Sequence, residues 1–192
     1  FRRVLFRSGS SLLILPTSGL YGQERKSTRT LQVGFIGMGG QIQGHVSQIA
    51  ELGHHVAALC DVDAAQLTKS QQRHGAATAK ASCYEDYRLL LEKEKSLDAV
   101  VIATPDHWHA VQAVKAAEAG KDIYCEKPIS HNFEEARAMV AAKDHFKRVV
   151  QVGTWQRSTK EFHDAIEYIR GNFDGVSRIV SGSERSTRHS SA

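Results

Sequence analysis

A glycine-rich turn at residues 37–40 follows a short apolar strand that we predict over residues 33–36. Residues 33–36 are mostly apolar, and the residues after the turn have the spacing of an amphipathic helix. Gly37 permits a tight turn, Gly39 lets the backbone approach a pyrophosphate, and the N–H groups at the helix start face the phosphate charge. The sequence therefore predicts a dinucleotide-binding βαβ unit. The turn residues expected to contact the dinucleotide are Gly37, Met38, Gly39, Gly40, Gln41 and Ile42.

The turn departs from the usual G-x-G-x-x-G pattern at its last position. The third glycine would stand at position 42, which is Ile42, and glycines occur instead at Gly40 and Gly44. A glycine turn by itself is a weak signal, and a plain loop is the alternative.

An aspartate follows the second apolar strand, which we predict over residues 55–60. Asp61 lies about 20 residues beyond the glycines, where a carboxylate accepts hydrogen bonds from an adenosine ribose. A carboxylate at this position also repels a 2′-phosphate, so the sequence favours NAD over NADP. The alternative is that Asp61 or Asp63 caps the helix over residues 64–73. We assign the cap to Asp63 and the ribose to Asp61.

A third group of polar residues follows the strand predicted over residues 98–103. Thr104 and Pro105 stand at its carboxyl end, where open α/β sheets bind ligands. His109 follows near the start of the next helix, and we expect all three residues to lie near the cofactor, with His107 as a capping or supporting residue. Two histidines beside an aspartate could also suggest a metal. No third ligand group is placed in the sequence, so we predict no metal site.

The fourth group is Glu126-Lys127-Pro128, which again follows an apolar strand and so belongs to the same edge of the sheet. A lysine beside a nicotinamide can donate to a substrate oxygen and relay the proton when a hydroxyl is oxidised. Glu126 could position this lysine or bind the nicotinamide ribose. Pro128 fixes the turn and is a candidate for a cis peptide bond. The alternative is a surface Glu–Lys pair in a loop.

Strands and helices alternate between residues 31 and 153. Strands are predicted at 33–36, 56–60, 98–103, 122–125 and 149–152, with a weaker one near 78, and helices at 41–52, 64–74, 84–94, 110–119 and 133–146. This alternation of helices with apolar strands predicts an α/β fold, a doubly wound parallel-sheet (Rossmann) domain over 31–153. A helix over 159–170 and a strand over 176–180 predict the truncated start of a second α/β domain over 154–192.

Composition limits the class of protein. The chain has 192 residues, of which 41% are hydrophobic and 24% charged, so it reads as soluble and globular. Its net charge of +4 lies largely near the two ends and is not interleaved with aromatic residues, which argues against nucleic-acid binding. Cys60, Cys83 and Cys125 are far apart and odd in number, so neither a disulfide framework nor a zinc site is expected. Two of them end apolar strands and should pack as small hydrophobic residues.

Residues 1–30 do not resemble part of the fold. An arginine pair precedes a short apolar run at 11–16, which resembles the end of a secretory signal peptide, of the twin-arginine type if the pair is native. The run is too short for stable membrane insertion. It predicts a periplasmic or secreted protein. The alternative is a non-native or disordered extension on a cytoplasmic protein, because residues 2–8 also resemble a translated sequencing adapter.

The order of these motifs resembles the glucose–fructose oxidoreductase/inositol dehydrogenase (Gfo/Idh/MocA) family. The resemblance runs from residue 31 to about residue 180, and its most distinctive part is the Glu-Lys-Pro group with Thr-Pro…His upstream. It implies that Lys127 is the catalytic or substrate-binding lysine and that Glu126 lies near the nicotinamide ribose. It also implies that Trp155 and Gln156 belong to a loop that crosses toward the nicotinamide. The Asp-His-Trp-His variant, preceded by an export-like segment, is similar to secreted members from environmental bacteria.

The resemblance implies an NAD-dependent oxidoreductase that acts on a sugar or cyclitol hydroxyl by hydride transfer. A minority branch of the family consists of glycosidases that use NAD in a transient oxidation, and a non-catalytic NAD-binding scaffold is the third alternative. Lys127 favours catalysis over a scaffold, and the intact Glu-Lys-Pro group favours the oxidoreductase. Family members carry a second domain that supplies further catalytic residues. We therefore expect this chain to be a fragment that is inactive alone, and the full-length protein to be a homo-oligomer.

Overall fold

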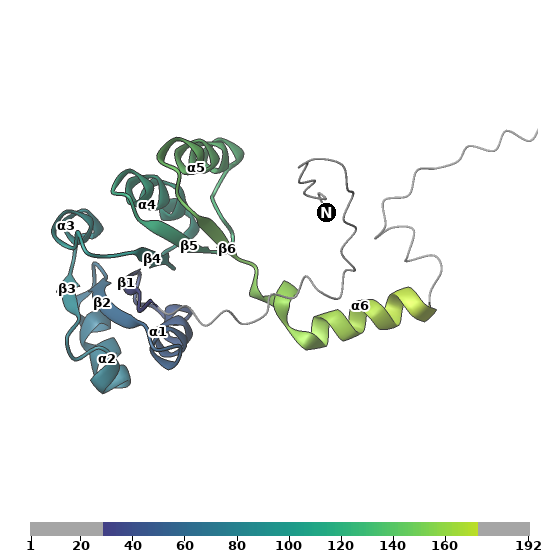
Figure 1. Ribbon diagram of the computed structural model, residues 1–192, viewed down its shortest axis with the longest axis horizontal. Helices are drawn as coiled ribbons and strands as arrows, with labels where there is room; N and C mark the ends of the chain where they lie inside the picture. Colours follow the sequence, from purple (N-terminus) through teal and green to yellow (C-terminus); the bar gives the residue numbers. More distant parts are fainter. Residues whose placement is uncertain (1–28, 173–192) are drawn as a thin grey trace, which may run out of the picture. The chain divides into compact units, whose positions relative to one another are not determined.

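The computed structural model describes residues 29–172, and these contain one parallel β-sheet (Figure 1). Its strands are β1 (Gln32–Ile36), β2 (His55–Cys60), β3 (Ser82–Tyr84), β4 (Ala99–Ile102), β5 (Asp122–Glu126) and β6 (Val150–Gly153). They are ordered β3-β2-β1-β4-β5-β6, and every neighbouring pair is parallel. This is the strand order of a dinucleotide-binding Rossmann sheet, in which the order reverses between the first and fourth strands. The predicted fold class is confirmed.

Helices cover both faces of this sheet. They are α1 (Ile42–Glu51), α2 (Ala64–His74), α3 (Tyr87–Lys93), α4 (Asp106–Glu118) and α5 (Phe133–Phe146), and the short 3₁₀ helix η2 (Gly75–Ala77) follows α2. Helices α3, α4 and α5 lie on one face, and α1 and α2 lie on the other (Figure 1). After β6 come the 3₁₀ helix η3 (Trp155–Ser158) and helix α6 (Lys160–Asn172). Within residues 29–172, no helix combines the length and the apolar composition that crossing a membrane requires.

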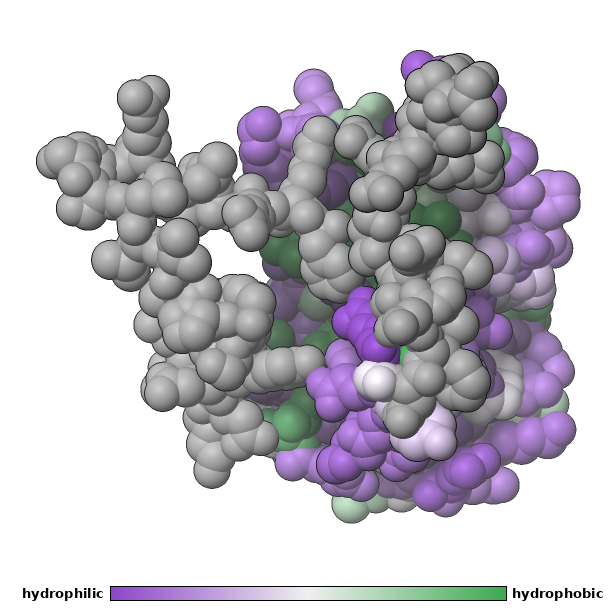
Figure 2. Space-filling model, turned by 90° about the vertical axis from the view of Figure 1, so that its right-hand side faces the viewer, coloured by the Kyte–Doolittle hydropathy of each residue, from purple (hydrophilic) through white to green (hydrophobic). Residues whose placement is uncertain are grey.

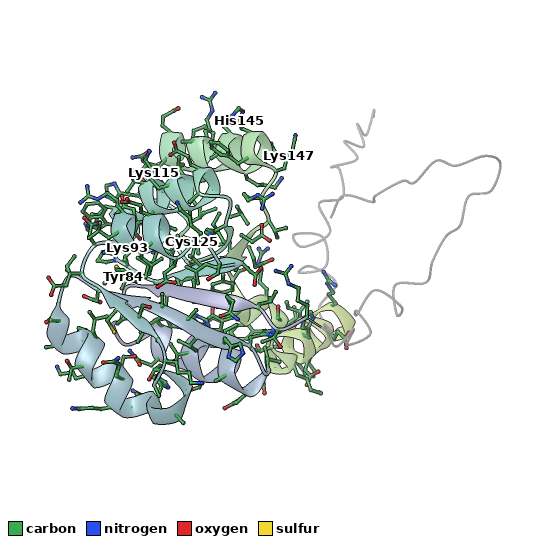
Figure 3. The ribbon with its side chains drawn as sticks, turned by 60° about the vertical axis from the view of Figure 1, so that its left-hand side comes forward. Tyr84, Lys93, Lys115, Cys125, His145 and Lys147 are labelled. Atoms are coloured by element: carbon green, nitrogen blue, oxygen red, sulfur yellow. The ribbon has the colours of Figure 1, made fainter. Side chains whose placement is uncertain are left out.

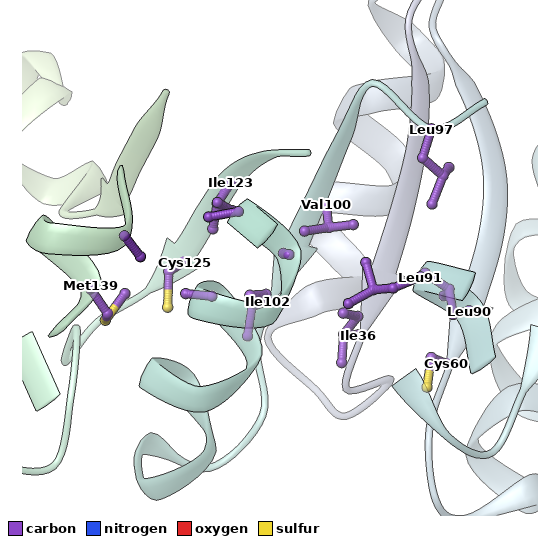
Figure 4. Packing of buried hydrophobic residues seen from close by; sticks show 14 of the residues in the cluster. Ile36, Cys60, Leu90, Leu91, Leu97, Val100, Ile102, Ile123, Cys125 and Met139 are labelled. Atoms are coloured by element: carbon purple, nitrogen blue, oxygen red, sulfur yellow. The ribbon is translucent and has the colours of Figure 1, made fainter. Parts of the chain in front are cut away.

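Each strand alternates its side chains between two hydrophobic cores. In β1, Phe35 packs toward α1 and α2, whereas Ile36 packs toward the opposite helices. The larger core joins Ile36, Val100 and Ile102 on the sheet to leucines of α3 and to Met139 of α5 (Figure 4). Fully burying one large apolar side chain contributes about 1.5–3 kcal/mol. The two cores therefore hold the strand ends in fixed register for the site described below.

Charged side chains lie on the outward sides of the helices, together with some exposed apolar ones such as Val111 and Val140. In Figure 3, Lys115 and His145 project away from the sheet, while Cys125 lies on the strand beneath them. Figure 2 shows hydrophilic side chains over much of the coloured surface on its side of the molecule.

Burial, and secondarily the neighbouring carboxylate of Asp61 or Glu126, raises the pKa of both Cys60 and Cys125 to about 12. Both thiols stay protonated at neutral pH and pack as small hydrophobic residues, as predicted.

The edge next to β2 differs from the sequence prediction. The strand expected near Thr78 lies at Ser82–Tyr84, and the residues before Thr78 form η2. Helix α3 was expected from Tyr84 but begins at Tyr87, because the Asp86 carboxylate caps it by accepting a hydrogen bond from the Arg88 N–H at 2.9 Å. The prediction was wrong here because a three-residue strand is too short to show a period.

Two other boundaries shift. Helix α4 begins at Asp106, four residues before the predicted start, and places both histidines of the motif in its first turns. The helix predicted over 41–52 ends at Glu51, and Leu52, which lies beyond its end, is 70% exposed. The helix predicted over 159–170 is confirmed as α6. The strand predicted over 176–180 lies outside the described residues.

Candidate functional site

A cavity of about 750 Å³ opens at the carboxyl edge of the sheet. The ends of β1, β2 and β4 all contribute to its wall, so it lies at the point where the strand order reverses. Doubly wound sheets bind dinucleotides at this point, and a concave, largely pre-formed cavity is the usual form of a cofactor site. Five of the predicted site residues line it together: Gly37, Gly39, Asp61, Thr104 and Pro105.

The glycine turn fits tightly between its neighbouring strands. Gly37 has a φ of 90°, and its N–H donates a hydrogen bond of 2.8 Å to the carbonyl of Cys60. A Cβ added to Gly37 would lie 2.8 Å from the backbone nitrogen of Thr104, so only glycine fits. A Cβ added to Gly39 meets no atom of the chain within 4 Å. The first glycine is thus required by the fold, and the second leaves room for a ligand to approach the backbone.

The carboxylate of Asp61 joins this turn to the start of α2. Its Oδ2 accepts a hydrogen bond from the Met38 N–H at 2.6 Å, and its Oδ1 accepts one from the Asp63 N–H at 2.9 Å. Asp63 caps α2 by accepting from the Ala65 N–H at 2.9 Å, as the sequence predicts. A carboxylate offers about four acceptor positions, so Asp61 can bind a ribose hydroxyl in addition to these contacts.

Behind the turn, the buried amide of Gln43 forms a network that sequence reasoning missed. Its Nε2 donates to the carbonyls of Met38 and Gly39 at 2.9 and 3.0 Å. Its Oε1 accepts from Ser70 Oγ at 3.2 Å and lies 2.7 Å from His74 Nε2. All of the amide's polar positions are used, so Gln43 links the carbonyls of the turn to two side chains of α2.

Burial, and secondarily the charge of Arg73, lowers the pKa of His74, which favours the neutral ring that donates to Gln43. The unfolded chain therefore binds this proton more readily than the folded one. The contribution of His74 to stability is full above its ordinary pKa of 6.5 and declines as the pH falls below that value.

Gln43→Met should lower the free energy of unfolding by about 1–3 kcal/mol, because it leaves buried polar groups without partners. It should also weaken cofactor binding, because the turn loses the amide that holds its carbonyls. Urea unfolding and calorimetry on the 192-residue chain measure both effects. Gln48→Met, at an exposed position of the same helix, is the matched control. Equal stability of the two variants would contradict the role given to Gln43.

Strand β5 ends at Glu126, and Lys127 and Pro128 follow it. Glu126 is 3% exposed, and its Oε2 accepts a hydrogen bond from the Lys127 N–H at 3.1 Å. Gly153 stands opposite on β6, and a Cβ there would lie 2.9 Å from Glu126 Cδ. Lys127 is exposed, and the Lys127–Pro128 peptide bond is cis, as expected. The carboxylate is therefore fixed while the lysine faces outward.

His109 connects this group to the Thr104 strand end. The ring is 1% exposed, with Nδ1 2.6 Å from the Pro128 carbonyl and Nε2 2.8 Å from the Thr104 carbonyl. The Thr104 hydroxyl in turn donates to Gln112 Oε1 at 2.7 Å. His109 thus connects the loop after β4 to the loop after β5. Its direct contact with the cofactor stays a prediction.

The remaining predicted residues lie around this edge. Ile42 is fully buried in the core under α1, so the departure from the third glycine serves helix packing. Trp155 and Gln156 form the start of η3, directly after β6, and Trp155 is about half exposed. Because Glu126 pairs with Gly153, this segment leaves the sheet next to the end of β5.

Sequence reasoning missed part of the cavity wall. Glu85, Asp86, Tyr87 and Arg88 line it, and Arg88 forms a two-pronged ion pair with Asp86 at 2.8 to 3.1 Å. They were missed because the third strand was predicted near residue 78 instead of at Ser82–Tyr84. Asp86, a residue type that commonly caps helices, could have located the start of α3. In the described part of the chain, no three His, Cys, Asp or Glu side chains gather as metal ligands.

Fold and site together define a dinucleotide-binding protein, and the comparisons with known proteins agree. Residues 31–154 match the model of the Gfo/Idh/MocA oxidoreductase family, which has an NAD-binding Rossmann fold. The chain belongs to this family.

Two curated relatives and one solved structure illustrate what this chain is similar to. An inositol 2-dehydrogenase of Paracoccus denitrificans is 34% identical over 131 residues, which are 67% of this chain and 38% of that protein. A glycosyl hydrolase family 109 protein of Shewanella pealeana is 33% identical over 58% of this chain and 25% of its own. The structure of the WlbA dehydrogenase of Bordetella pertussis, in complex with NADH and UDP-GlcNAcA, aligns with a TM-score of 0.66 and 27% identity over 75% of this chain and 44% of its own. The chain thus spans less than half the length of each of these relatives.

Proposed function

We propose that the full-length protein is an NAD-dependent oxidoreductase that removes a hydride from the carbon that bears a hydroxyl of a sugar or cyclitol. The observation that carries this proposal is the placement of one cavity and one lysine loop on the same edge of the sheet. Gly37, Asp61 and Thr104 line the cavity, and His109 ties the Thr104 strand end to the loop that carries Lys127. The 34% identity to an inositol 2-dehydrogenase supports the substrate class.

The residues fit a dinucleotide. The N–H groups of Gly37 and Met38 are engaged within the chain, so Gly39, Gly40 and the first turn of α1 would bind the pyrophosphate. Asp61 would bind the adenosine ribose. When bound, NAD supplies the hydride acceptor. Lys127 would hold the substrate hydroxyl and take up its proton as the hydride leaves.

The test is an assay of the full-length gene product for NADH formation with a panel of sugars and cyclitols. Substrate-dependent NADH formation, followed by its absorbance, is the expected result. A protein that binds NAD but reduces none with any member of the panel would contradict the proposal.

A second candidate is a glycosidase that uses NAD transiently, favoured by the 33% identity to the glycosyl hydrolase family 109 protein. It predicts release of an aryl leaving group from an aryl glycoside without net NADH. NADH and the released aryl group are measured in one experiment, and their relative amounts distinguish the oxidoreductase from the glycosidase. If the protein binds NAD but forms neither product, the result would favour the third alternative, a non-catalytic NAD-binding scaffold.

The cofactor is expected to be NAD, because the carboxylate of Asp61 should repel a 2′-phosphate. Calorimetry on the 192-residue chain should give a lower Kd for NAD than for NADP. Asp61→Asn keeps an acceptor for the Met38 N–H but removes the charge, so it should weaken NAD binding by about 1.5–3 kcal/mol, or roughly one to two decades. Equal or reversed affinities in the unmodified chain would overturn this assignment.

The location of the protein is a separate proposal, which rests on the apolar run at 11–16, outside the described residues. We expect export, so the mature protein should appear in the periplasm or the medium when cells expressing the complete native gene are fractionated. Protein found only in the cytoplasm, with residues 11–25 still attached, would defeat the idea.

A further inference from the structure

His45, a residue of α1 that the proposed function does not use, contacts the end of β5. Its Nε2 lies 2.8 Å from Glu126 Oε1, and the side chains are 16% and 4% exposed. The two residues are 81 positions apart in the chain. Helix α1 begins directly after the glycine turn, so this pair joins the pyrophosphate side of the site to the lysine loop.

The carboxylate of Glu126 is held on three sides. His45 contacts one oxygen, and the Lys127 N–H donates to the other. On the third side lies Gly153, where even a Cβ would come within 2.9 Å of Glu126 Cδ. The Tyr124 ring packs against His45 with a centroid distance of 5.0 Å. Without the histidine, Oε1 would lose its donor while it stays buried, which is unfavourable, so the contact with His45 helps to keep the carboxylate in one orientation.

We propose that His45 is a positioning residue for Lys127. By holding Glu126, it fixes the carboxylate that accepts the Lys127 N–H and thereby sets the direction in which the lysine leaves the strand. The inference rests on the proposed function where it concerns turnover. Its structural half, the coupling of His45 to the Lys127 N–H, does not depend on any activity.

The experiment compares two amides of different length. His45→Gln places an N–H donor near the position of Nε2, whereas the shorter His45→Asn cannot reach Glu126. His55→Asn changes an exposed histidine at the start of β2 and is the control. In the 192-residue chain, hydrogen exchange at the Lys127 amide should become at least about tenfold faster in His45→Asn and change little in His45→Gln. Equal exchange in the two variants would overturn the proposal.

In the full-length enzyme, His45→Asn should lower kcat by about 10²-fold, as expected for a misplaced reacting group, while the Kd for NAD stays within a few-fold. His45→Gln should restore most of this loss. A purely structural role would lower stability without a difference in kcat between Gln and Asn, and that result would also overturn the proposal. If the unmodified enzyme forms no NADH with any substrate, the proposed function fails, and the exchange measurement still decides the role of His45.

Discussion

In the full-length protein, Lys127→Met is expected to lower the turnover of the proposed reaction by about 10²–10⁴-fold, the range typical of a general acid–base group. Lys127 directly follows β5, and Thr104 follows the neighbouring strand β4; the Lys127 side chain is exposed at this carboxyl edge of the sheet. In the proposed function, its amine would reach a substrate hydroxyl beside the nicotinamide. The Kd for NAD should change little, because the phosphates and the ribose are assigned to the glycine turn and to Asp61.

The matched control is Lys115→Met, which removes an exposed lysine on the outer side of α4 (Figure 3). It should leave both turnover and NAD affinity unchanged. Steady-state kinetics with calorimetry of NAD binding separate the possible results. Near-normal turnover in Lys127→Met would show that the lysine is a surface residue without a catalytic role. Loss of NAD binding with an intact fold would instead make it a cofactor clamp.

The parts of this fold that local patterns encode were predictable from the sequence. Apolar runs followed by Gly37, Asp61 and Thr104 predicted strands whose carboxyl ends meet at one edge, and the cavity brings these three residues together. The distinction between Asp61 at the strand end and Asp63 as a helix cap was also correct in its geometry. In each case the signal lies within a few residues of the side chain concerned.

The contacts that hold the site in shape were not predictable in this way. Gln43 reaches Ser70 on the neighbouring helix, and His45 reaches Glu126 on a strand much later in the chain. Both residues lie in a helical pattern whose period reports only which positions face the sheet. Which polar side chain meets which partner depends on how α1 crosses the sheet. Only the assembled fold shows this.

Two alanine substitutions in the glycine turn are expected to have large effects on NAD binding, but only one of them should also lower stability. Gly37→Ala should cost stability, because a residue with a side chain at a φ of 90° is strained by about 1–3 kcal/mol, and the new Cβ would lie 2.8 Å from the Thr104 backbone nitrogen. The backbone of Thr104 cannot move aside without disturbing the end of β4. We therefore expect both a lower midpoint in urea and a loss of NAD binding of at least about tenfold.

Gly39→Ala should separate these two effects. No atom of the chain lies within 4 Å of its added Cβ, so stability should stay within about 0.5 kcal/mol of the unmodified chain. NAD affinity should nevertheless fall by at least about tenfold, because the methyl group would stand between the backbone and the pyrophosphate. Gly44→Ala, at an exposed position within α1, is the control and should raise stability by about 0.5–1 kcal/mol without affecting NAD. Undiminished NAD binding by Gly39→Ala would show that the pyrophosphate does not approach the turn at this residue, and the phosphate site would then have to be moved toward the first turn of α1.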